Sequence, residues 1–510
     1  MNLFSILYKN PDEGISEKEH QEPAFFLDLH LDQIVDALTS GFEEYDLKPF
    51  FYDSLKSVDA IVYRQEIIRE LGDTQLFEVL KSFSDGMRTM RKHLVQAEKL
   101  HYPYQKKRWF LDAVTIYCET ITCLANNLGH LDLTSHGFLA LREFLNQYSQ
   151  SPGFTSLVAE IAQLNAELSG VTYHLHIRGN EITVRKSESN RDYIKEVEHT
   201  FERFLQDPVQ PFHEQFSEYP DMNHVEAKVL DLVALQYPDV FAHLDAFQEK
   251  NLNYLDKTVA RFDREIQFYI AYLELVARIR SKELSFCIPQ VSDADKAIES
   301  REGFDLALAI NLAREEKTVV TNDFFLEGRE RIFVITGPNQ GGKTTFARVF
   351  GQLHFLASLG CPVPGSTARL YLFDKIFTHF EREESIGNLR SKLEDDLVRI
   401  RTIITQSTSR SIIIINEMFT STTVQDALFL GTKVLEQAIH LDLLCIYVTF
   451  LDELSMLEKT VSMVSTVAPE NPDVRTYKLV RRPADGLSYA IAIARKNRVT
   501  YEEIMERIPS

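Results

Sequence analysis

Residues 337–344 read G-P-N-Q-G-G-K-T and closely follow an apolar run at 332–335. A strand that ends in G-x-x-x-x-G-K-[ST] and leads into a helix is the Walker A phosphate cradle. The glycines let successive backbone N–H groups face an anion, and the N-terminus of the following helix adds partial positive charge. A chance glycine turn is the weaker interpretation, because all four fixed positions are present. The sequence therefore predicts a nucleoside triphosphate site.

In a Walker A loop the lysine and the hydroxyl residue that follows it have separate roles. We expect Lys343 to reach the β- and γ-phosphates and the Thr344 hydroxyl to ligate Mg²⁺. ATP and Mg²⁺ are thus the expected cofactors. The expected nucleotide-binding residues of the loop are Gly337, Pro338, Asn339, Gln340, Gly341, Gly342, Lys343, Thr344 and Thr345.

A second apolar run ends in the polar pair Asn416 and Glu417. Residues 411–417 read S-I-I-I-I-N-E, which has the form of a Walker B strand. In a P-loop ATPase the strand-end acid supports Mg²⁺, and a neighbouring residue orients or deprotonates the attacking water. Asn416 keeps an acceptor oxygen for the metal but lacks the charge, and Glu417 is the expected catalytic base. A plain core strand is the alternative.

A third apolar run, at 443–449, is followed by Phe450. Many ATPases place a polar residue at such a strand end to sense the γ-phosphate, and a phenyl ring cannot donate that hydrogen bond. Together with Asn416, this is a second departure from a strong hydrolytic site. We expect slow turnover or a relocated switch.

In combination these segments resemble the MutS mismatch-repair ATPases. T-G-P-N-Q-G-G-K-T-T at 336–345 is similar to the family's T-G-P-N-x-G-G-K-S/T-T, which is more specific than the general P-loop. The resemblance is close over 291–510 and weaker upstream, where 57–67 resembles the start of the family's helical core. Further matches follow in the family's order: G-C-P-V-P at 360–364, D-K-I-F-T at 374–378, N-E with T-T within 416–423, V-T-F-L-D-E-L at 448–454, and the closing segment 477–495.

The resemblance implies a dimer, here expected to be a homodimer, whose long levers end in clamps that close on DNA under ATP control. Its ATP sites are composite, and Ser391 matches the serine that reaches the γ-phosphate of the neighbouring subunit. The family also packs an aromatic side chain on the adenine, for which Phe324 and Phe325 are candidates, and we expect Asn322 to lie near the nucleotide. Downstream repair proteins are further implied partners.

This chain departs from the family pattern in several places. Asn416 stands where the family has an aspartate, and Phe450 where it has a histidine. Core-like sequence begins by about residue 25, which leaves no room for the family's N-terminal mismatch-reading domain. The F-x-E triplet at 42–44 is interpreted as a coincidence. We expect a divergent branch without that domain, and the DNA form that it recognises stays open.

The overall composition is that of an ordinary globular protein, with 44% hydrophobic and 25% charged residues. The net charge of −20 argues against adhesion of the whole surface to nucleic acid, so DNA contact needs a local basic face. The five cysteines have no zinc-site spacing and are interpreted as reduced thiols. Because neither a signal-peptide pattern nor a membrane-spanning run is found, we expect a cytoplasmic protein with no membrane partner.

The elements that must position these residues fall into two predicted domains. Apolar positions recur every three to four residues through most of 1–290, which favours a helical core, lever or clamp-like region with a β-hairpin near 171–186. The run 240–284 contains no glycine or proline and, if unbroken, would be a helix of roughly 65 Å, so we expect a lever or a coiled hairpin there. Strands then alternate with helices, so 291–510 is predicted to be an α/β P-loop NTPase domain of the ABC type.

Two basic segments are candidates for contact with DNA. Segment 81–110 carries eight basic and two acidic side chains, interleaved with Tyr102, Tyr104 and Trp109. Cations neutralise phosphates and aromatic rings stack on bases, but a solvated helix face with its aromatics packed inward explains the pattern equally well. The candidate residues, of which the last three lie near the predicted hairpin, are Arg88, Arg91, Lys92, Lys106, Lys107, Arg108, Arg178, Arg185 and Lys186.

Two functions from different classes remain open at this point. One is an ATP-hydrolysing, DNA-binding enzyme of the mismatch-repair type, with Lys343, Glu417 and Ser391 as catalytic residues and Thr344 and Asn416 at the metal. The other is a nucleotide-dependent dimeric binding or scaffold module with little or no hydrolysis. An ATPase of the SMC or ABC transporter type is a remoter alternative, because its L-S-G-G-Q signature is missing.

Overall fold

A computed structural model describes residues 4–10, 21–179, 181–187, 222–280, 284–313, 315, 317, 319–381, 392–468, 470–484, 500–501 and 504. The chain forms two compact units. The helical unit comprises residues 73–134 and 138–263 together with 1–3, and the α/β unit comprises residues 4–72, 135–137 and 264–510. The N-terminal residues 4–72 thus belong to the same compact unit as the C-terminal sheet. The boundary expected near residue 290 marks the change from a helical to an alternating strand–helix sequence, and it stays a prediction.

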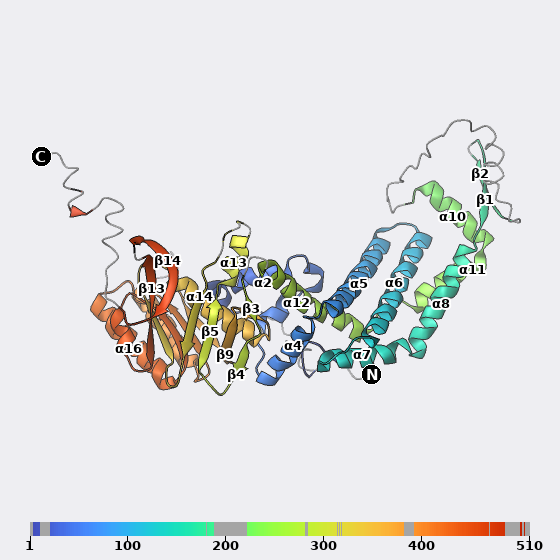
Figure 1. Cartoon of the computed structure of the whole chain (residues 1–510). Coiled ribbons are helices and arrows are strands. Elements are labelled where there is room, and N and C mark those ends of the chain that lie inside the picture. The colour runs from blue at the N-terminus through green and yellow to red at the C-terminus, as the bar shows by residue number, and fades with distance from the viewer. Residues whose placement is uncertain are drawn as a thin grey trace. The chain divides into compact units, whose positions relative to one another are not determined.

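The described part of the helical unit consists of helices and one β-hairpin (Figure 1). Asp73 starts α5 by accepting a hydrogen bond from the Leu76 N–H at 2.8 Å, and Ser151 caps α8 just before a proline in its first turn. Helices α5 and α6 pack along each other through apolar residues spaced by three and four. The elements are α5 (Thr74–Lys99), α6 (Pro103–Gly129), α7 (His136–Ser149), α8 (Pro152–Ser169), β1 (Tyr173–Arg178), β2 (Glu181–Lys186), α10 (His224–Gln236), α11 (Pro238–Lys250) and the start of α12 (Lys257–Arg280).

The apolar run at 240–284 is not one helix. Helix α11 ends at Lys250, and α12 begins at Lys257. The Asp256 carboxylate accepts hydrogen bonds from the N–H groups of Thr258 (2.7 Å) and Val259 (3.1 Å), which caps the new helix. The run is therefore two helices and not a single unbroken helix of roughly 65 Å. The apolar period continues across the break because both helices bury a face, so periodicity alone could not reveal it.

The α/β unit contains a six-stranded sheet in the order β10-β11-β12-β7-β13-β14. The first five strands are parallel, and the last is antiparallel to its neighbour. These strands are β7 (Ile332–Thr336), β10 (Ile376–His379), β11 (Ile412–Asn416), β12 (Leu444–Val448), β13 (Thr460–Ala468) and β14 (Asn471–Arg481). A four-stranded sheet has the order β4-β9-β5-β6, and β3 pairs with β8. Their bounds are β3 (Phe286–Cys287), β4 (Gln290–Ser292), β5 (Ile298–Gly303), β6 (Asn322–Leu326), β8 (Val363–Pro364) and β9 (Thr367–Tyr371).

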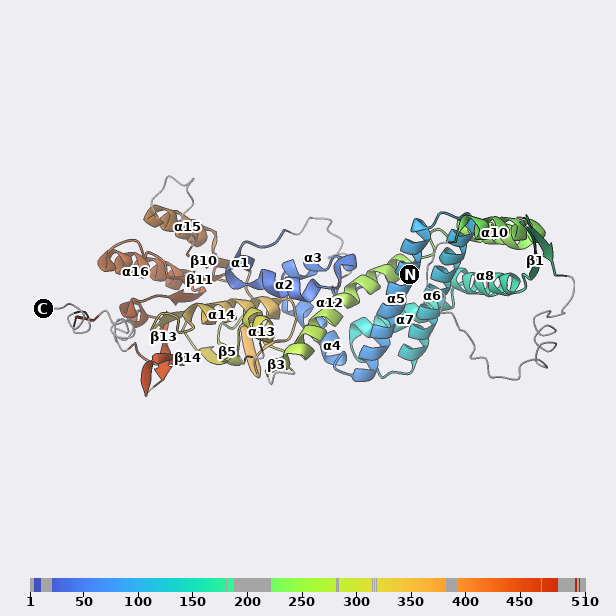
Figure 2. The same ribbon diagram turned by 90° about the horizontal axis from the view of Figure 1, so that it is seen from above.

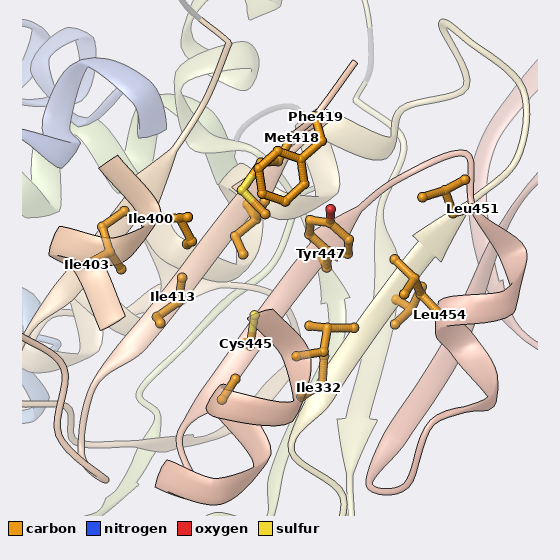
Figure 3. Close-up of a cluster of buried hydrophobic side chains, with 14 of the residues drawn as sticks. Ile332, Ile400, Ile403, Ile413, Met418, Phe419, Cys445, Tyr447, Leu451 and Leu454 are labelled. Atoms are coloured by element: carbon orange, nitrogen blue, oxygen red, sulfur yellow. The ribbon is translucent and has the colours of Figure 1, made fainter. Parts of the chain in front are cut away.

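Helices cover both faces of the six-stranded sheet (Figure 2). On one face α15 (Lys392–Gln406) and α16 (Val424–Leu441) bury an apolar cluster that includes Ile413, Tyr447 and Ile332 (Figure 3). On the other face lies α14 (Lys343–Ser358), so close that a Cβ on Gly351 would stand 2.8 Å from the Ile414 side chain. The remaining elements are α1 (Phe25–Leu29), α2 (Leu31–Thr39), η2 (Glu43–Tyr45), α3 (Lys48–Tyr52), α4 (Val58–Glu70), α13 (Leu306–Ala313) and η3 (Asp452–Met456).

Helix α14 is also fixed from the N-terminal side of the chain. The Arg348 Nε donates to the Asp28 carbonyl at 3.1 Å, and the Gln352 amide donates to the Leu29 carbonyl at 2.9 Å. The Asp28 carboxylate in turn accepts from the Thr378 hydroxyl on β10 at 2.6 Å. Helix α1 thus bridges α14 and the sheet, which orients the helix that leaves the Walker A loop.

Asp442 joins three segments that precede strands of the α/β unit. It lies between α16 and β12 with a left-handed φ of 55°. Its carboxylate contacts Lys296 Nζ at 3.0 Å, Arg331 Nε at 3.0 Å and Lys459 Nζ at 3.4 Å. Burial works against the charged form, but Lys296 and Arg331 outweigh it and hold the pKa of Asp442 below its usual range. Without this one carboxylate, three largely buried cations would face one another.

We predict that Asp442→Asn lowers the free energy of unfolding by about 1–2 kcal/mol, a value discounted because the carboxylate is partly exposed. Asparagine keeps the shape and tolerates the left-handed φ, so the substitution removes only the charge. The pKa of Asp442 is lower in the folded than in the unfolded protein. The variant should therefore lose the full stability contribution at pH values above the unfolded-state pKa, and the difference from the wild type should disappear as the pH falls through the folded-state pKa.

Urea unfolding at neutral and acidic pH measures this effect. Glu436→Gln is the matched control, since it removes a carboxylate from an exposed pair with Lys433. Equal unfolding midpoints for Asp442→Asn and the wild type at neutral pH would contradict the role assigned to the charge.

Among the helices that the structure describes, none is long and apolar enough to cross a membrane.

Candidate functional site: a phosphate cradle beside a strand-end carboxylate

The loop between β7 and α14 forms a tight cradle. All five residues of β7 are buried, and the loop after it needs positive φ at Gly337 (116°) and Gly342 (89°). A Cβ on Gly337 would meet the Ser465 carbonyl oxygen at 2.9 Å, and one on Gly341 would meet the Ser465 hydroxyl at 2.2 Å. Only glycine therefore fits where the loop crosses β13, and the loop leads directly into the 16-residue helix α14, whose N-terminus lies at the cradle.

Lys343 lies folded over this loop and is 5% exposed. Its ammonium donates to the carbonyls of Gly337 (2.9 Å) and Pro338 (3.3 Å) and to Asn339 Oδ1 (3.1 Å). Burial lowers the pKa of Lys343, against the opposing charge of Glu417 and with a smaller contribution from Arg475. A buried ammonium that rests on three neutral oxygens has a strong electrostatic preference for an anion, so the phosphate role expected for Lys343 agrees with its surroundings.

Thr344 and Asn416 meet across the site. The Thr344 hydroxyl donates to Asn416 Oδ1 at 2.9 Å. Thr344 lies in the first turn of α14, which follows β7, and Asn416 ends β11, and strand β12 lies between β7 and β11 in the sheet. Both residues end up together because the carboxyl ends of parallel strands share one edge of the sheet. The geometry thus brings together the two residues expected at the metal.

Glu417 follows directly and lines the same cavity as Lys343 and Thr344. Its backbone has a φ of 54°, and its N–H donates to the Val448 carbonyl of β12 at 3.0 Å. A carboxylate in this place can accept a proton from a water held near the cradle.

The cavity above the loop has a volume of about 830 Å³. Residues 339–345 and Glu417 line it together with the aliphatic side chains of Leu308, Leu312, Val319 and Val320. Tyr477 of β14 also lines it, beside Gly342 of the loop. A cavity of this size with both polar and apolar lining suits a nucleotide. Tyr477 and the aliphatic wall were missed at the sequence level, and only the position of Tyr477 in a matched closing segment hinted at its place.

Asn322 lies on the cavity wall, but its amide is already used. Its Nδ2 donates to the Tyr477 carbonyl at 3.1 Å, and its Oδ1 accepts from the Leu479 N–H at 2.8 Å. Asn322 therefore holds β14 and Tyr477 at the edge of the cavity. The two phenylalanines considered for the adenine do not line the cavity: Phe324 is buried among Phe333, Phe346 and Phe350, and Phe325 stacks under Arg481.

The third strand end carries no polar side chain toward the cavity. The Phe450 side chain is 54% exposed, while the preceding Thr449 is buried and accepts a hydrogen bond from the Leu451 N–H at 3.0 Å. Ser391, expected to act in a neighbouring subunit, lies outside the described residues.

The donor set fits a triphosphate with Mg²⁺. The cradle admits only glycine at its narrow points, and the Thr344 hydroxyl and Asn416 amide oxygen are the oxygen ligands that Mg²⁺ accepts beside phosphate and water. In the described part of the chain, no cluster of three or more His, Cys, Asp or Glu side chains could hold a metal by itself. A metal at this site would thus depend on phosphate oxygens for most of its ligands.

The basic candidates on α5 and α6 are largely tied into the helical unit. Arg91 pairs with Asp263, Lys107 Nζ lies 2.5 Å from Asp245, and Arg108 lies 2.7 Å from Asp112. Tyr104 packs on Phe241 and Trp109 on His93, as expected for aromatics turned inward. Of the other candidates in these helices, Lys92 is exposed, and Arg88 and Lys106 are half-buried.

The hairpin presents its basic residues differently. Arg178 and Arg185 are exposed and lie on the same face, since Arg178 pairs with Glu181 and Arg185 with His174 in the β1–β2 register. Lys186 belongs to the opposite face, where its ammonium lies 4.6 Å from the centre of the Tyr237 ring.

Comparison with known proteins agrees with the site geometry. The family model described as MutS domain V matches residues 333–507. DNA mismatch repair protein MutS of Erythrobacter litoralis is 30% identical over 223 residues, which is 42% of this chain and 25% of the relative. The C-terminal part of this chain, residues 333–507, is a MutS-family domain.

Other relatives match with a higher identity over a shorter length or with a lower identity over a longer one. DNA mismatch repair protein MutS of Thermotoga maritima is 32% identical over 187 residues, covering 36% of this chain and 24% of the relative. The protein of the same name from Desulfovibrio desulfuricans is 26% identical over 373 residues, covering 72% of this chain and 37% of the relative. The match thus spans between about a quarter and somewhat over a third of these MutS proteins.

Proposed function

We propose that this MutS-family chain binds ATP with Mg²⁺, hydrolyses it slowly, and uses the nucleotide to control its hold on DNA. The observation that carries the proposal is the convergence of Lys343, the Thr344–Asn416 contact and Glu417 on one cavity beside a glycine-only loop. Two segments far apart in sequence, residues 337–344 and 416–417, supply these groups. Their arrangement matches the chemical needs of phosphoryl transfer to water.

Each residue then has a defined task. The loop N–H groups and the start of α14 bind the phosphates, and the Lys343 ammonium exchanges its loop carbonyls for phosphate oxygens. Bound Mg²⁺ neutralises phosphate charge, with Thr344 and Asn416 as the residues that would hold it. Glu417 orients the attacking water and accepts its proton. Because Asn416 contributes no charge to the metal and Phe450 no hydrogen bond to the γ-phosphate, hydrolysis is slow.

The proposal extends to a homodimer with composite sites, in which Ser391 of the partner subunit completes the γ-phosphate pocket. DNA binds to a local basic face, because the chain as a whole is acidic. The exposed face of the hairpin with Arg178 and Arg185 suits this task better than the ion-paired α5–α6 surface. A DNA-bound protein of this kind acts in the cytoplasm with downstream repair proteins.

A second function is a nucleotide-locked dimeric binding module without hydrolysis. The amide at Asn416 and the phenyl ring at Phe450 favour it, since both weaken the hydrolytic machinery without touching the phosphate cradle.

Steady-state ATP hydrolysis separates these functions. We predict that the wild type turns over ATP above the Lys343→Ala blank and that turnover responds to one of duplex, mismatched, branched or single-stranded DNA. Glu417→Gln should lower the hydrolysis rate at least about 100-fold while ATP stays bound, because the general base is lost. ATP binding with no turnover above the blank on any DNA would establish the binding module instead.

The amide at position 416 gives a gain-of-function prediction. Asn416→Asp keeps the contact with Thr344 and adds a negative charge at the metal, so half-maximal nucleotide binding should need about tenfold less Mg²⁺. Titration of Mg²⁺ against a fluorescent ATP analogue measures it. Asn311→Asp adds the same charge on α13 at an exposed site and should change nothing; an equal shift in both variants would refute a local effect.

The hairpin prediction concerns DNA. Replacing Arg178 and Arg185 by alanine should weaken binding of labelled duplex and lower the salt dependence by about one unit of slope for each lost phosphate contact. Fluorescence anisotropy between 50 and 200 mM salt, roughly the range in which such losses are large, provides the measurement. Arg108→Ala is the control, because Arg108 is held by Asp112. Weaker DNA binding in Arg108→Ala with unchanged binding in the hairpin variant would instead assign the DNA contact to the α5–α6 surface.

A further inference from the structure

The segment that carries Glu417 is held in a strained conformation. Two of its residues, Glu417 (φ 54°) and Phe419 (φ 64°), have left-handed backbones although neither is glycine. Such residues lose free energy relative to an ordinary conformation and persist only where their surroundings determine the backbone. The direction of the Glu417 side chain therefore depends on whatever fixes this segment.

Part of that support is apolar. Met418 and Phe419 are 3% and 1% exposed and insert into the cluster formed with α15, α16 and the sheet (Figure 3). Apolar contacts have little directional preference, so they hold the side chains in place without selecting the orientation of each peptide plane. The backbone needs hydrogen bonds for that purpose.

Two hydrogen bonds bracket the segment. The Glu417 N–H donates to the Val448 carbonyl at 3.0 Å, which is a contact within the sheet edge. The Phe419 N–H donates to Asp396 Oδ2 at 3.4 Å, which comes from a different element, helix α15. Asp396 is thus the side chain that ties the far end of the strained segment to a neighbouring helix.

Asp396 is a buried carboxylate, 7% exposed, and His379 lies beside it. His379 ends β10 and is 1% exposed, and its Nε2 lies 3.3 Å from Asp396 Oδ1 without good hydrogen-bond alignment. Burial works to raise the pKa of Asp396, but His379, the Phe419 N–H and Arg399 outweigh it and keep the pKa below the usual range. The acceptor for Phe419 is consequently a charged one, and charged acceptors form the stronger hydrogen bonds.

We propose that Asp396 is a positioning residue for Glu417: through the Phe419 N–H, and supported by His379, it holds the strained segment so that the Glu417 carboxylate faces the phosphate cradle. The expected effect of Asp396 on the rate of hydrolysis rests on the proposed function, because it presumes that Glu417 serves hydrolysis. The expected effect on the backbone of residues 416–421 does not depend on that function. Asp396 touches neither Lys343 nor Thr344 in the described contacts, so nucleotide binding and base orientation should separate.

Hydrogen–deuterium exchange of the free protein tests the backbone consequence. In Asp396→Asn, amides in a peptide covering 416–421 should exchange at least tenfold faster than in the wild type, while the peptide covering 337–345 is unchanged. Asp395→Asn is the matched control, since it removes a charge from the adjacent residue of the same helix. Asp396→Glu keeps the charge and should restore part of the protection, which a purely volumetric role would not produce. Unchanged exchange in Asp396→Asn would overturn the proposal.

His379→Gln provides a second variant that leaves Asp396 in place, for use if Asp396→Asn does not fold. It should raise exchange in 416–421 by a smaller factor, and wild-type exchange in this variant would remove His379 from the support and contradict the proposal.

Steady-state ATP kinetics tests the effect of Asp396 on the rate of hydrolysis. Asp396→Asn should lower kcat about tenfold with KM for ATP within threefold of the wild type. A raised KM with unchanged kcat would contradict positioning of the base. If the wild type shows no turnover above Lys343→Ala, the proposed hydrolysis fails, and the exchange result still decides the role of Asp396.

Discussion

The end of α14 buries carbonyl groups that the helix cannot satisfy by itself, and the N-terminal part of the chain supplies the donors. The Leu55 N–H donates to the Ser358 carbonyl at 3.0 Å, and the fully buried Arg64 donates to the Leu359 carbonyl at 3.1 Å. Unpaired buried carbonyls are costly, so these partners are close to obligatory. The helix that starts at the phosphate cradle therefore finishes on α4 and on the segment between α3 and α4. These contacts help to make residues 4–72 part of the α/β unit, although the Arg64–Leu359 contact spans 295 residues of sequence.

Local features of the chain were the most predictable. The strands β7, β11 and β12 could be found because each is an uninterrupted apolar run that ends in a turn or in polar residues, and the meeting of Thr344 with Asn416 follows from parallel pairing alone. The break at Asp256 was hidden, since capping by one carboxylate interrupts a helix without disturbing its apolar period. The domain boundary, the composite site and the contacts with DNA remain predictions.

Tertiary pairings could not be predicted in the same way. Phe324 and Phe325 are adjacent, and in a strand one of the two must face the core, but the sequence does not say which. Tyr477 is held at the cavity by Asn322, which binds the Tyr477 carbonyl and the Leu479 N–H of β14. Asp396 and Phe419 come together through the packing of a helix on a sheet, and neither residue carries a motif.

Strand β14 has a further consequence for how the molecule avoids aggregation. It is the terminal strand of the six-stranded sheet, and such a strand offers unpaired backbone groups on which a foreign strand can grow. Here the Leu479 N–H is already taken by Asn322, Lys478 reaches the Thr321 carbonyl, and Arg481 pairs with Glu330. Charged side chains and a side-chain amide thus cap this border and discourage the addition of another strand. Association between copies is thereby directed away from open-ended sheet extension.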